Sequence, residues 1–155
     1  MLKLVKPELK EMTFRQKLLA DRATMSYNRA YGGTIDFPRS RWESWYRKWV
    51  GNGDPKYFYR YLYCPSLLAY VGEAAYHFEP ETGRYLCDVI IHHTYRRRGF
   101  GAEGLELLCR AAKERGIQAL YDDIAADNPA VELFLKCGFE AVHRDETVCT
   151  VRKKL

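Results

Sequence analysis

The stretch from Val89 to Leu105 restricts the fold most, because it passes from a strand through glycines into a helix. It reads VIIHHTYRRRGFGAEGL, an apolar β-branched run followed by three arginines and by two glycines around Phe100. A loop that opens a helix in this way directs several backbone N–H groups, and the positive end of the helix dipole, at one point. A side chain at the glycines would hold an anion away from that backbone. The sequence therefore predicts a site for a phosphorylated cofactor.

Strands without intervening helices precede this stretch. Apolar and aromatic segments at Tyr57–Tyr63, Leu67–Phe78 and Arg84–Ile91 are separated by turn sequences, which predicts an antiparallel meander. An amphipathic helix over Ala102–Arg115 and a strand over Ala119–Ala125 follow. The order of these elements predicts a mixed α/β chain with a largely antiparallel sheet.

The two ends of the chain supply further elements. The N-terminal part predicts a short strand at Leu2–Val5, one or two helices over Glu8–Tyr31 and an aromatic helix over Arg41–Val50. The C-terminal part predicts a helix capped by Asn128 and stopped by Gly138, and then a closing hairpin made of Phe139–Arg144 and Thr147–Arg152. We expect one domain over residues 1–155, with a helical segment at 1–56, a cofactor-binding core at 57–139 and the hairpin at 140–155.

Composition narrows the class of protein. The 155 residues are 47% hydrophobic and 29% charged, with a net charge of +5, which is typical of a globular protein. No apolar run approaches membrane-spanning length, the start does not resemble a signal peptide, and no nucleic-acid motif accompanies the basic residues. The five cysteines are scattered without a Cys-x-x-Cys pair, which predicts reduced thiols, a cytoplasmic location and no metal site.

The glycines also match a dinucleotide fingerprint, since Gly99–Gly104 reads GFGAEG and the acidic Asp122 and Asp123 follow at about the expected distance. The surrounding elements argue against that interpretation. His92–Arg98 separate the strand from the first glycine, and a meander replaces the repeated parallel βα units that a dinucleotide fold needs. A nicotinamide-dependent oxidoreductase is therefore the less favoured alternative.

Two motifs together resemble a known family. Arg96–Ala102, RRRGFGA, resembles the Arg/Gln-x-x-Gly-x-Gly/Ala signature of the GNAT superfamily of acyl-CoA-dependent N-acetyltransferases. Asn128–Phe139, NPAVELFLKCGF, is similar to the second motif of that family, and the spacing between the two is also family-like. The resemblance implies a mixed, mostly antiparallel sheet whose central strands, ending at Ile91 and Ala125, splay apart.

The resemblance further implies acetyl-CoA as cofactor, bound in that opening. The pyrophosphate would take N–H groups of the glycine loop, and the pantetheine arm would pair with strand backbone near Ile90–His92. The expected cofactor-binding residues are Ile90, Ile91, His92, Arg96, Arg97, Arg98, Gly99, Phe100, Gly101, Ala102, Asn128 and Phe134.

The catalytic groups are less clear, because Phe134 stands where many family members carry a tyrosine that protonates the departing thiolate, and phenylalanine has no proton to donate. Either the thiolate leaves unassisted, or Tyr121 or Tyr95 serves instead. The ionisable residues on the central strands are the candidates for a general base, and these are Glu73, Asp88 and His92. Of all these groups, Glu73 and Tyr121 are our predicted catalytic residues.

The acceptor side is expected in the divergent N-terminal segment. Its predicted substrate-binding residues are Tyr27, Asp36 and Trp42, with Asn28 and Trp45 as further candidates, although core packing explains the aromatic residues as well. Acidic residues would suit a cationic amine.

The sequence thus predicts an enzyme that transfers acetyl from acetyl-CoA to a primary amine of a small molecule or peptide, by direct attack in a ternary complex. A non-catalytic acyl-CoA-binding module is the alternative that Phe134 supports. We expect neither nucleic acid nor membrane as a partner, and a homodimer is compatible with the resemblance.

Overall fold

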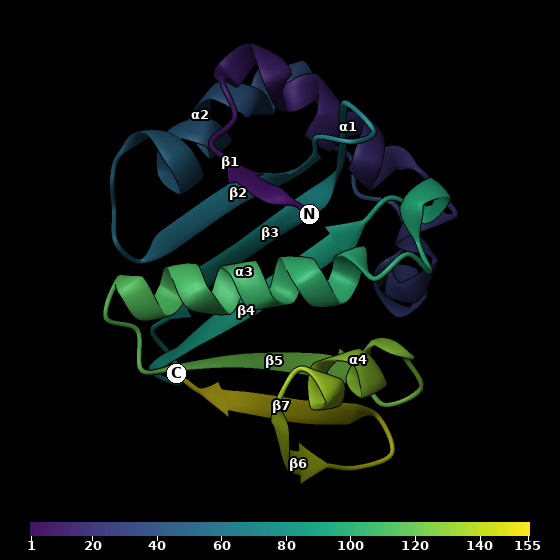
Figure 1. Ribbon diagram of the computed structural model, residues 1–155, viewed down its shortest axis with the longest axis vertical. Coiled ribbons are helices and arrows are strands. Elements are labelled where there is room, and N and C mark those ends of the chain that lie inside the picture. The colour runs from purple at the N-terminus through teal and green to yellow at the C-terminus, as the bar shows by residue number, and fades with distance from the viewer.

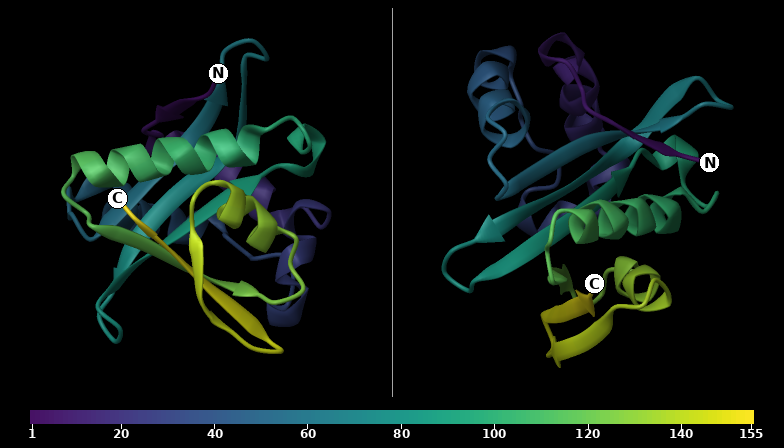
Figure 2. Two further views of the ribbon diagram at one scale, coloured as in Figure 1. Left: turned by 60° about the horizontal axis from the view of Figure 1, so that its bottom comes forward. Right: turned by 60° about the vertical axis from the view of Figure 1, so that its left-hand side comes forward.

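A computed structural model of the chain describes residues 1–29 and 31–155. Seven strands form one sheet in the order β1-β2-β3-β4-β5-β7-β6, with helices on both of its faces (Figures 1 and 2). The strands are β1 (Lys3–Val5), β2 (Tyr57–Cys64), β3 (Ala69–Glu79), β4 (Arg84–Ile91), β5 (Ala119–Ala125), β6 (Glu140–Arg144) and β7 (Val148–Lys154). The mixed, mostly antiparallel sheet predicted from the sequence is confirmed.

The helices are shorter and more broken than predicted at the N-terminus. The α-helices are α1 (Met12–Ala20), α2 (Trp42–Tyr46), α3 (Phe100–Glu114) and α4 (Ala130–Lys136). Short 3₁₀ or π segments are η1 (Leu9–Glu11), η2 (Thr24–Tyr31), η3 (Arg39–Arg41), η4 (Arg47–Gly51) and η5 (His93–Tyr95). The predicted helix over Glu8–Tyr31 is interrupted at Asp21, whose backbone is extended and whose carboxylate accepts the Thr24 N–H at 2.9 Å. An aspartate that bonds a nearby backbone N–H in this way starts a new helical turn.

Each face of the sheet has its own hydrophobic core. Helix α3 packs on one face through the predicted stripe of Leu105, Leu108, Cys109 and Ala112, which are all buried. The N-terminal helices pack on the other face, where Met12, Leu18 and Leu19 are buried (Figure 2, right). Gly116 ends α3 with a φ of 81° and Gly138 follows α4 with a φ of 93°, as the sequence predicts.

The sheet opens at its centre. Strands β4 and β5 are parallel and share a single bridge, Leu86 with Tyr121, whereas β5 pairs with β7 along its whole length. Beyond that bridge the two strands diverge toward Ile91 and Ala125, as Figure 1 shows. The backbone groups that face this opening are therefore not used by a neighbouring strand. Among the described residues, no helix is long and apolar enough to cross a membrane.

Candidate functional site

The glycine loop at the end of β4 has the backbone of an anion cradle. Arg97 has a φ of 64° and Gly99 a φ of 81°, both in the left-handed region that L side chains seldom adopt. Gly99 precedes α3 directly, and Glu103 N–H is the first to bond within the helix, to the carbonyl of Gly99. Within the described part of the chain, the N–H groups of residues 100–102 have no backbone or side-chain acceptor, so they are available to a phosphate.

The three arginines of the loop differ in their contacts. Arg96 donates to the carbonyls of Thr24 at 2.6 Å, Ile91 at 3.2 Å and Ala23 at 3.4 Å, so its guanidinium ties the N-terminal segment to the end of β4. The sequence predicts a cofactor-binding role for Arg96, and in this structure its guanidinium is engaged within the chain. Arg97 and Arg98 are exposed and form no ion pair with a described residue. They are the loop's available cations.

Helix α4 packs against the start of α3. A Cβ at Gly101 would lie 3.1 Å from the Leu133 side chain, so the glycine allows α3 and α4 to pack closely. Asn128 accepts the Ala130 N–H at 2.9 Å and caps α4, as predicted from its position. Phe134 is 4% exposed and its ring packs edge-on against Phe139 at 4.9 Å, so the structure places this residue in the core.

A pocket of about 280 Å³ lies on the opposite face of the sheet, beside the point where β4 and β5 diverge. Strands β2, β3, β4 and β5 form its floor, and α1, η2, α2 and η4 form its walls. It is lined by Arg15, Leu19, Tyr27, Ile35, Trp45, Trp49, Tyr59, Glu73, Ala75, His77, Leu86, Cys87, Asp88, Ile90 and Asp122. Because Ile90 is one of the residues expected beside the pantetheine arm, this pocket adjoins the predicted cofactor path.

Glu73 lies at the base of the pocket, where its charge is compensated. One Arg15 nitrogen donates to both of its carboxylate oxygens at 2.8 Å, and the Tyr59 hydroxyl donates to it as well. Burial raises the pKa of Glu73, and the Arg15 charge opposes that rise. With all its oxygens engaged and 3% of its surface exposed, Glu73 is poorly placed to accept a proton from a substrate.

Asp88 on β4 and Asp122 on β5 have no cationic partner of the kind that Arg15 provides for Glu73. Neither carboxylate forms an ion pair, and neither accepts a hydrogen bond from a side chain that the structure describes. Desolvation, with the nearby Glu73 charge, raises the pKa of Asp88 to about 6, while the pocket mouth leaves its side chain open to water. Desolvation and the Asp88 charge raise the pKa of Asp122 well above its usual value. Two unpaired carboxylates in one pocket are a common sign of a functional site.

Aromatic rings form the wall of the pocket. Trp45 and Trp49 stack at 5.6 Å, and the Arg15 guanidinium lies 4.1 Å from the Trp45 ring. Burial and the three neighbouring carboxylates raise the pKa of Tyr27, so its phenol keeps its proton and can donate a hydrogen bond. Of the three predicted acceptor residues, Tyr27 is the one that lines the pocket.

The other two predicted acceptor residues lie elsewhere. Trp42 is 8% exposed, and its indole N–H donates to the Phe37 carbonyl at 3.2 Å, so it belongs to the core behind the pocket. Asp36 is exposed and does not line the cavity. The tryptophans are spaced three and four apart, but only Trp45 and Trp49 line the pocket, whereas Trp42 is buried.

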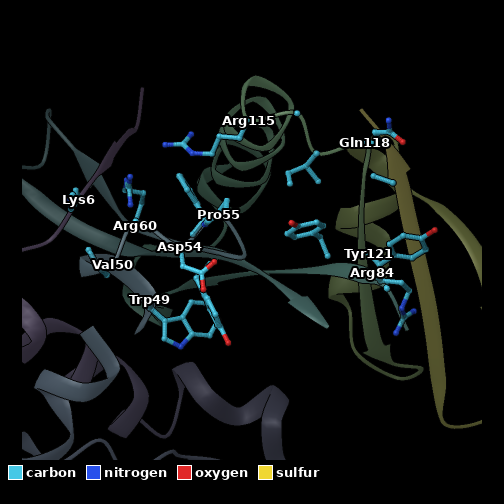
Figure 3. A pocket seen from close by; sticks show the side chains of 18 residues that line it. Lys6, Trp49, Val50, Asp54, Pro55, Arg60, Arg84, Arg115, Gln118 and Tyr121 are labelled. Carbon is cyan, nitrogen blue, oxygen red and sulfur yellow. The ribbon is translucent and has the colours of Figure 1, made fainter. Parts of the chain in front are cut away.

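Tyr121, the predicted acid, lines a different cleft. This second cleft, of about 840 Å³, lies near the C-terminal end of α3, and Figure 3 shows Tyr121 beside Arg84 in it. The Arg84 guanidinium lies 5.2 Å from the Tyr121 ring. Residues alternate between the faces of a strand, and Tyr121 points away from its neighbour Asp122. None of the glycine-loop residues lines the second cleft, so we do not assign acyl transfer to it.

Asp21, His92 and His93 form a cluster whose ligand atoms lie within 4.8 Å of one another. The His92 Nδ1 accepts the Thr94 N–H at 3.2 Å, which requires the proton of a neutral ring to be on Nε2, the atom that faces Asp21. A metal-binding histidine instead donates through its other nitrogen. The two rings lie 3.8 and 3.7 Å from the Asp21 carboxylate, and the His93 N–H donates to the Thr24 hydroxyl at 3.0 Å, so the segment after β4 is secured to η2.

Comparison with known proteins identifies the family. The family model described as the acetyltransferase (GNAT) family matches residues 21–139. The chain belongs to the GNAT acetyltransferase family. Its matched region includes both motifs, the opening and most of the pocket, and it ends at Phe139.

Solved structures share the fold at low sequence identity. A GNAT-family acetyltransferase from Streptococcus pneumoniae has a TM-score of 0.79 and 17% identity, covering 100% of both chains. The yncA protein of Salmonella typhimurium, solved with its cofactor acetyl-CoA, has a TM-score of 0.75 and 15% identity over 100% of this chain and 94% of its own. The paia N-acetyltransferase of Thermoplasma acidophilum, solved in complex with coenzyme A, has a TM-score of 0.69 and 12% identity over 100% and 99%. No curated protein sequence matches the chain.

Proposed function

We propose that this GNAT-family protein transfers an acetyl group from acetyl-CoA to the primary amine of a small molecule or peptide. The observation that carries the proposal is that two sites adjoin at the opening between β4 and β5. One is a cradle of unused N–H groups at the start of α3, and the other is a pocket with two unpaired carboxylates. An acetyltransferase needs both, a site for the coenzyme phosphates and a site that deprotonates an amine.

The cofactor would be held by the loop and by strand backbone. N–H groups of residues 97–102 would bind the pyrophosphate, and Arg97 and Arg98 would add charge. Because His92 N–H bonds Val71 on β3, the alternation of antiparallel pairing turns the N–H of the preceding Ile91 toward the opening. The cofactor complexes of the Salmonella and Thermoplasma relatives support coenzyme A as the ligand for this family.

Asp88 is our candidate for the general base, in place of the Glu73 predicted from the sequence. Its carboxylate would take a proton from the bound ammonium, and the resulting neutral amine would attack the thioester carbonyl carbon. A pKa of about 6 keeps Asp88 ionised at neutral pH and close to the optimum for a base. The Ile91 N–H would stabilise the negative charge that develops on the carbonyl oxygen.

The amine nitrogen must also lose a second proton, and the departing thiolate must gain one. When the C–N bond forms and the C–S bond breaks, the nitrogen loses this second proton, the departing sulfur takes up one proton, and Asp88 returns its own to water. Phe134 cannot serve as the acid, and Tyr121 faces the other cleft. We therefore propose that the thiolate leaves unassisted and is protonated through solvent at the opening.

The proposal is tested by binding and turnover together. Coenzyme A at a hundred times its dissociation constant should stabilise the folded protein by about 2.7 kcal/mol, and a nicotinamide dinucleotide should not. A panel of primary amines with acetyl-CoA should then release free thiol and acetylated amine in equal amounts. Stabilisation by the dinucleotide alone would contradict the cofactor assignment, and tight coenzyme A binding without turnover on any amine would contradict the enzyme.

The second outcome would favour the alternative function, a non-catalytic acyl-CoA-binding module. The observation in its favour is Phe134, which is buried at the position where many family members carry the acidic tyrosine. The oxidoreductase alternative has lost its structural basis, because β4 and β5 are the sheet's one parallel pair of described strands and no repeated βα unit is present among them.

A further inference from the structure

The pocket at the divergence of β4 and β5 contains more carboxyl groups than basic groups. Its lining includes three carboxylates, those of Glu73, Asp88 and Asp122, and one guanidinium, that of Arg15. Burial lowers the pKa of His77, the remaining basic residue of the lining, so that its ring is neutral at pH 7. Because Arg15 and Glu73 pair with each other, Asp88 and Asp122 are the unpaired acidic groups of the lining, and a bound ammonium would favour their ionised forms.

Arg15 is already paired with Glu73 and packed against aromatic rings, which disfavours its binding of an anionic ligand. Its Nη1 donates to Glu73, and its guanidinium lies against the rings of Trp45, Phe37 and Tyr59 at 4.1, 5.0 and 5.3 Å. Only 15% of its side chain is exposed. Within the described residues, the pocket offers no free cation to a carboxylate or phosphonate, and bringing such a group beside two carboxylates would be repulsive.

The rest of the lining suits a short aliphatic stem. Trp49, Tyr59 and Ile90 supply aromatic and apolar surface, and aromatic faces also attract ammonium groups. At about 280 Å³ the cavity lies just below the range of pockets that hold drug-sized ligands, so it fits a small acceptor.

We propose that the acceptor is a small aliphatic diamine, or a similar amine with a second cationic group and no anionic group. This inference rests on the proposed acetyltransferase function and adds a role for Asp122. Asp88 faces the reacting amine, since it shares a strand and a face with Ile90, next to the expected thioester. Asp122, on the other side of the divergence, binds the second ammonium and is a specificity-determining residue.

Three primary amines with the same number of carbon atoms, five, test the proposal. In 1,5-diaminopentane, n-pentylamine and 5-aminopentanoate the reacting amine is the same, and the far end is an ammonium, a methyl or a carboxylate. We expect kcat/KM for the diamine to exceed that for pentylamine about tenfold and that for aminopentanoate at least about a hundredfold, which corresponds to roughly 1.4 and 2.7 kcal/mol. Equal use of aminopentanoate and the diamine would overturn the proposal.

The Asp122→Asn variant tests the residue. It should reduce the preference for diamine over pentylamine to about one, whereas Glu81→Gln, which removes one charge from the exposed β3–β4 turn, should keep the wild-type preference. Retention of the full preference in Asp122→Asn would refute the role of Asp122. Should that variant not fold, Asp122→Glu, which keeps the charge, must retain the preference.

Calorimetric binding of the three compounds to the protein saturated with coenzyme A separates this inference from the proposed function. Selective binding of the diamine without acetylation supports the charge-based selection and contradicts the enzyme. Acetylation of all three with equal efficiency supports the enzyme and contradicts the selection. Binding of none of the three contradicts the inference.

Discussion

One nitrogen of the Arg15 guanidinium lies 2.8 Å from both carboxylate oxygens of Glu73. This ion pair joins α1 to β3 at the base of the pocket and engages Arg15, whose guanidinium lines the pocket. Asp88 has no cationic partner of its own, and desolvation, together with the Glu73 charge and against that of Arg15, raises its pKa. The pair positions the groups around it, and Asp88 is left to exchange protons with a substrate.

The pH dependence of catalysis follows from the pKa of Asp88. As pH rises through about 6, Asp88 ionises and becomes able to accept a proton, so kcat/KM of the wild type should rise with an apparent pKa near that value. Asp88→Asn should lower kcat/KM by about 10²–10⁴ and remove this rise. Steady-state rates between pH 5 and 8, with coenzyme A affinity as the control, provide the measurement. An unchanged profile in the variant would exclude Asp88 as the base.

The Asp88 carboxyl group should also make the folded protein less stable as pH rises. The folded-state pKa of Asp88, about 6, exceeds the ordinary value of 3.8, so the folded chain binds more protons than the unfolded chain between these values. The Asp88 contribution to the free energy of unfolding is therefore fully present below about pH 4 and is lost as pH rises through about 6. We expect Asp88→Asn to melt higher than wild type at pH 7.5, and this advantage to shrink at pH 4.5. Thermal melts at the two pH values measure it, and an equal advantage at both would contradict the raised pKa.

Glu73→Gln distinguishes a positioning role from the catalytic role predicted from the sequence. Arg15 would remain buried without its partner, and breaking a buried ion pair costs about 3–5 kcal/mol of stability. Loss of the Glu73 charge should also lower the pKa of Asp88, because a repulsive neighbour disappears and Arg15 is released. The apparent pKa of kcat/KM should then shift below 6 while the rise itself persists. Complete loss of the rise of kcat/KM with pH in Glu73→Gln would indicate that Glu73 is the base.

Substitutions of Arg96 and Arg98 should have different effects on stability and on coenzyme A affinity, although one residue separates the two positions. Arg96→Gln removes donors to three carbonyls, and hydrogen bonds from charged groups contribute about 1.5–3 kcal/mol, so this variant should melt lower. Arg98→Gln should keep its melting temperature and bind coenzyme A about tenfold more weakly, with a smaller dependence on salt. Melting curves and calorimetry of both variants decide the matter. A loss of affinity confined to Arg96→Gln would reverse the assignment.

Local patterns allowed much of the fold to be predicted. The meander, the apolar stripe of α3 and the helix ends at Gly116 and Gly138 each depend on residues close together in the sequence. The opening between β4 and β5 was implied by the family resemblance. One or two helices were predicted over Glu8–Tyr31, but not the break at Asp21, because the bond of the Asp21 carboxylate to the Thr24 N–H competes with a continuous helix.

The site was less predictable, since its chemistry depends on contacts between distant residues. Arg15 and Glu73 are 58 positions apart, and nothing in the spacing shows that one neutralises the other. Arg96 belongs to a phosphate-loop motif, yet its contacts are with the backbone of η2. Both faces of the sheet are covered, so alternation along β5 does not tell which face carries the pocket, and Tyr121 lines the second cleft.

The most direct test of the central claim is to detect both products of one reaction. Wild-type protein, acetyl-CoA and 1,5-diaminopentane are incubated at pH 7.5, with Asp88→Asn in parallel, and free coenzyme A and acetylated amine are quantified by mass spectrometry. The predicted result is equal amounts of both products with wild type and a rate lower by at least about a hundredfold with the variant. Coenzyme A release without acetylated amine on this or any other primary amine, or equal rates for the two proteins, would contradict the proposed acetyl transfer through Asp88.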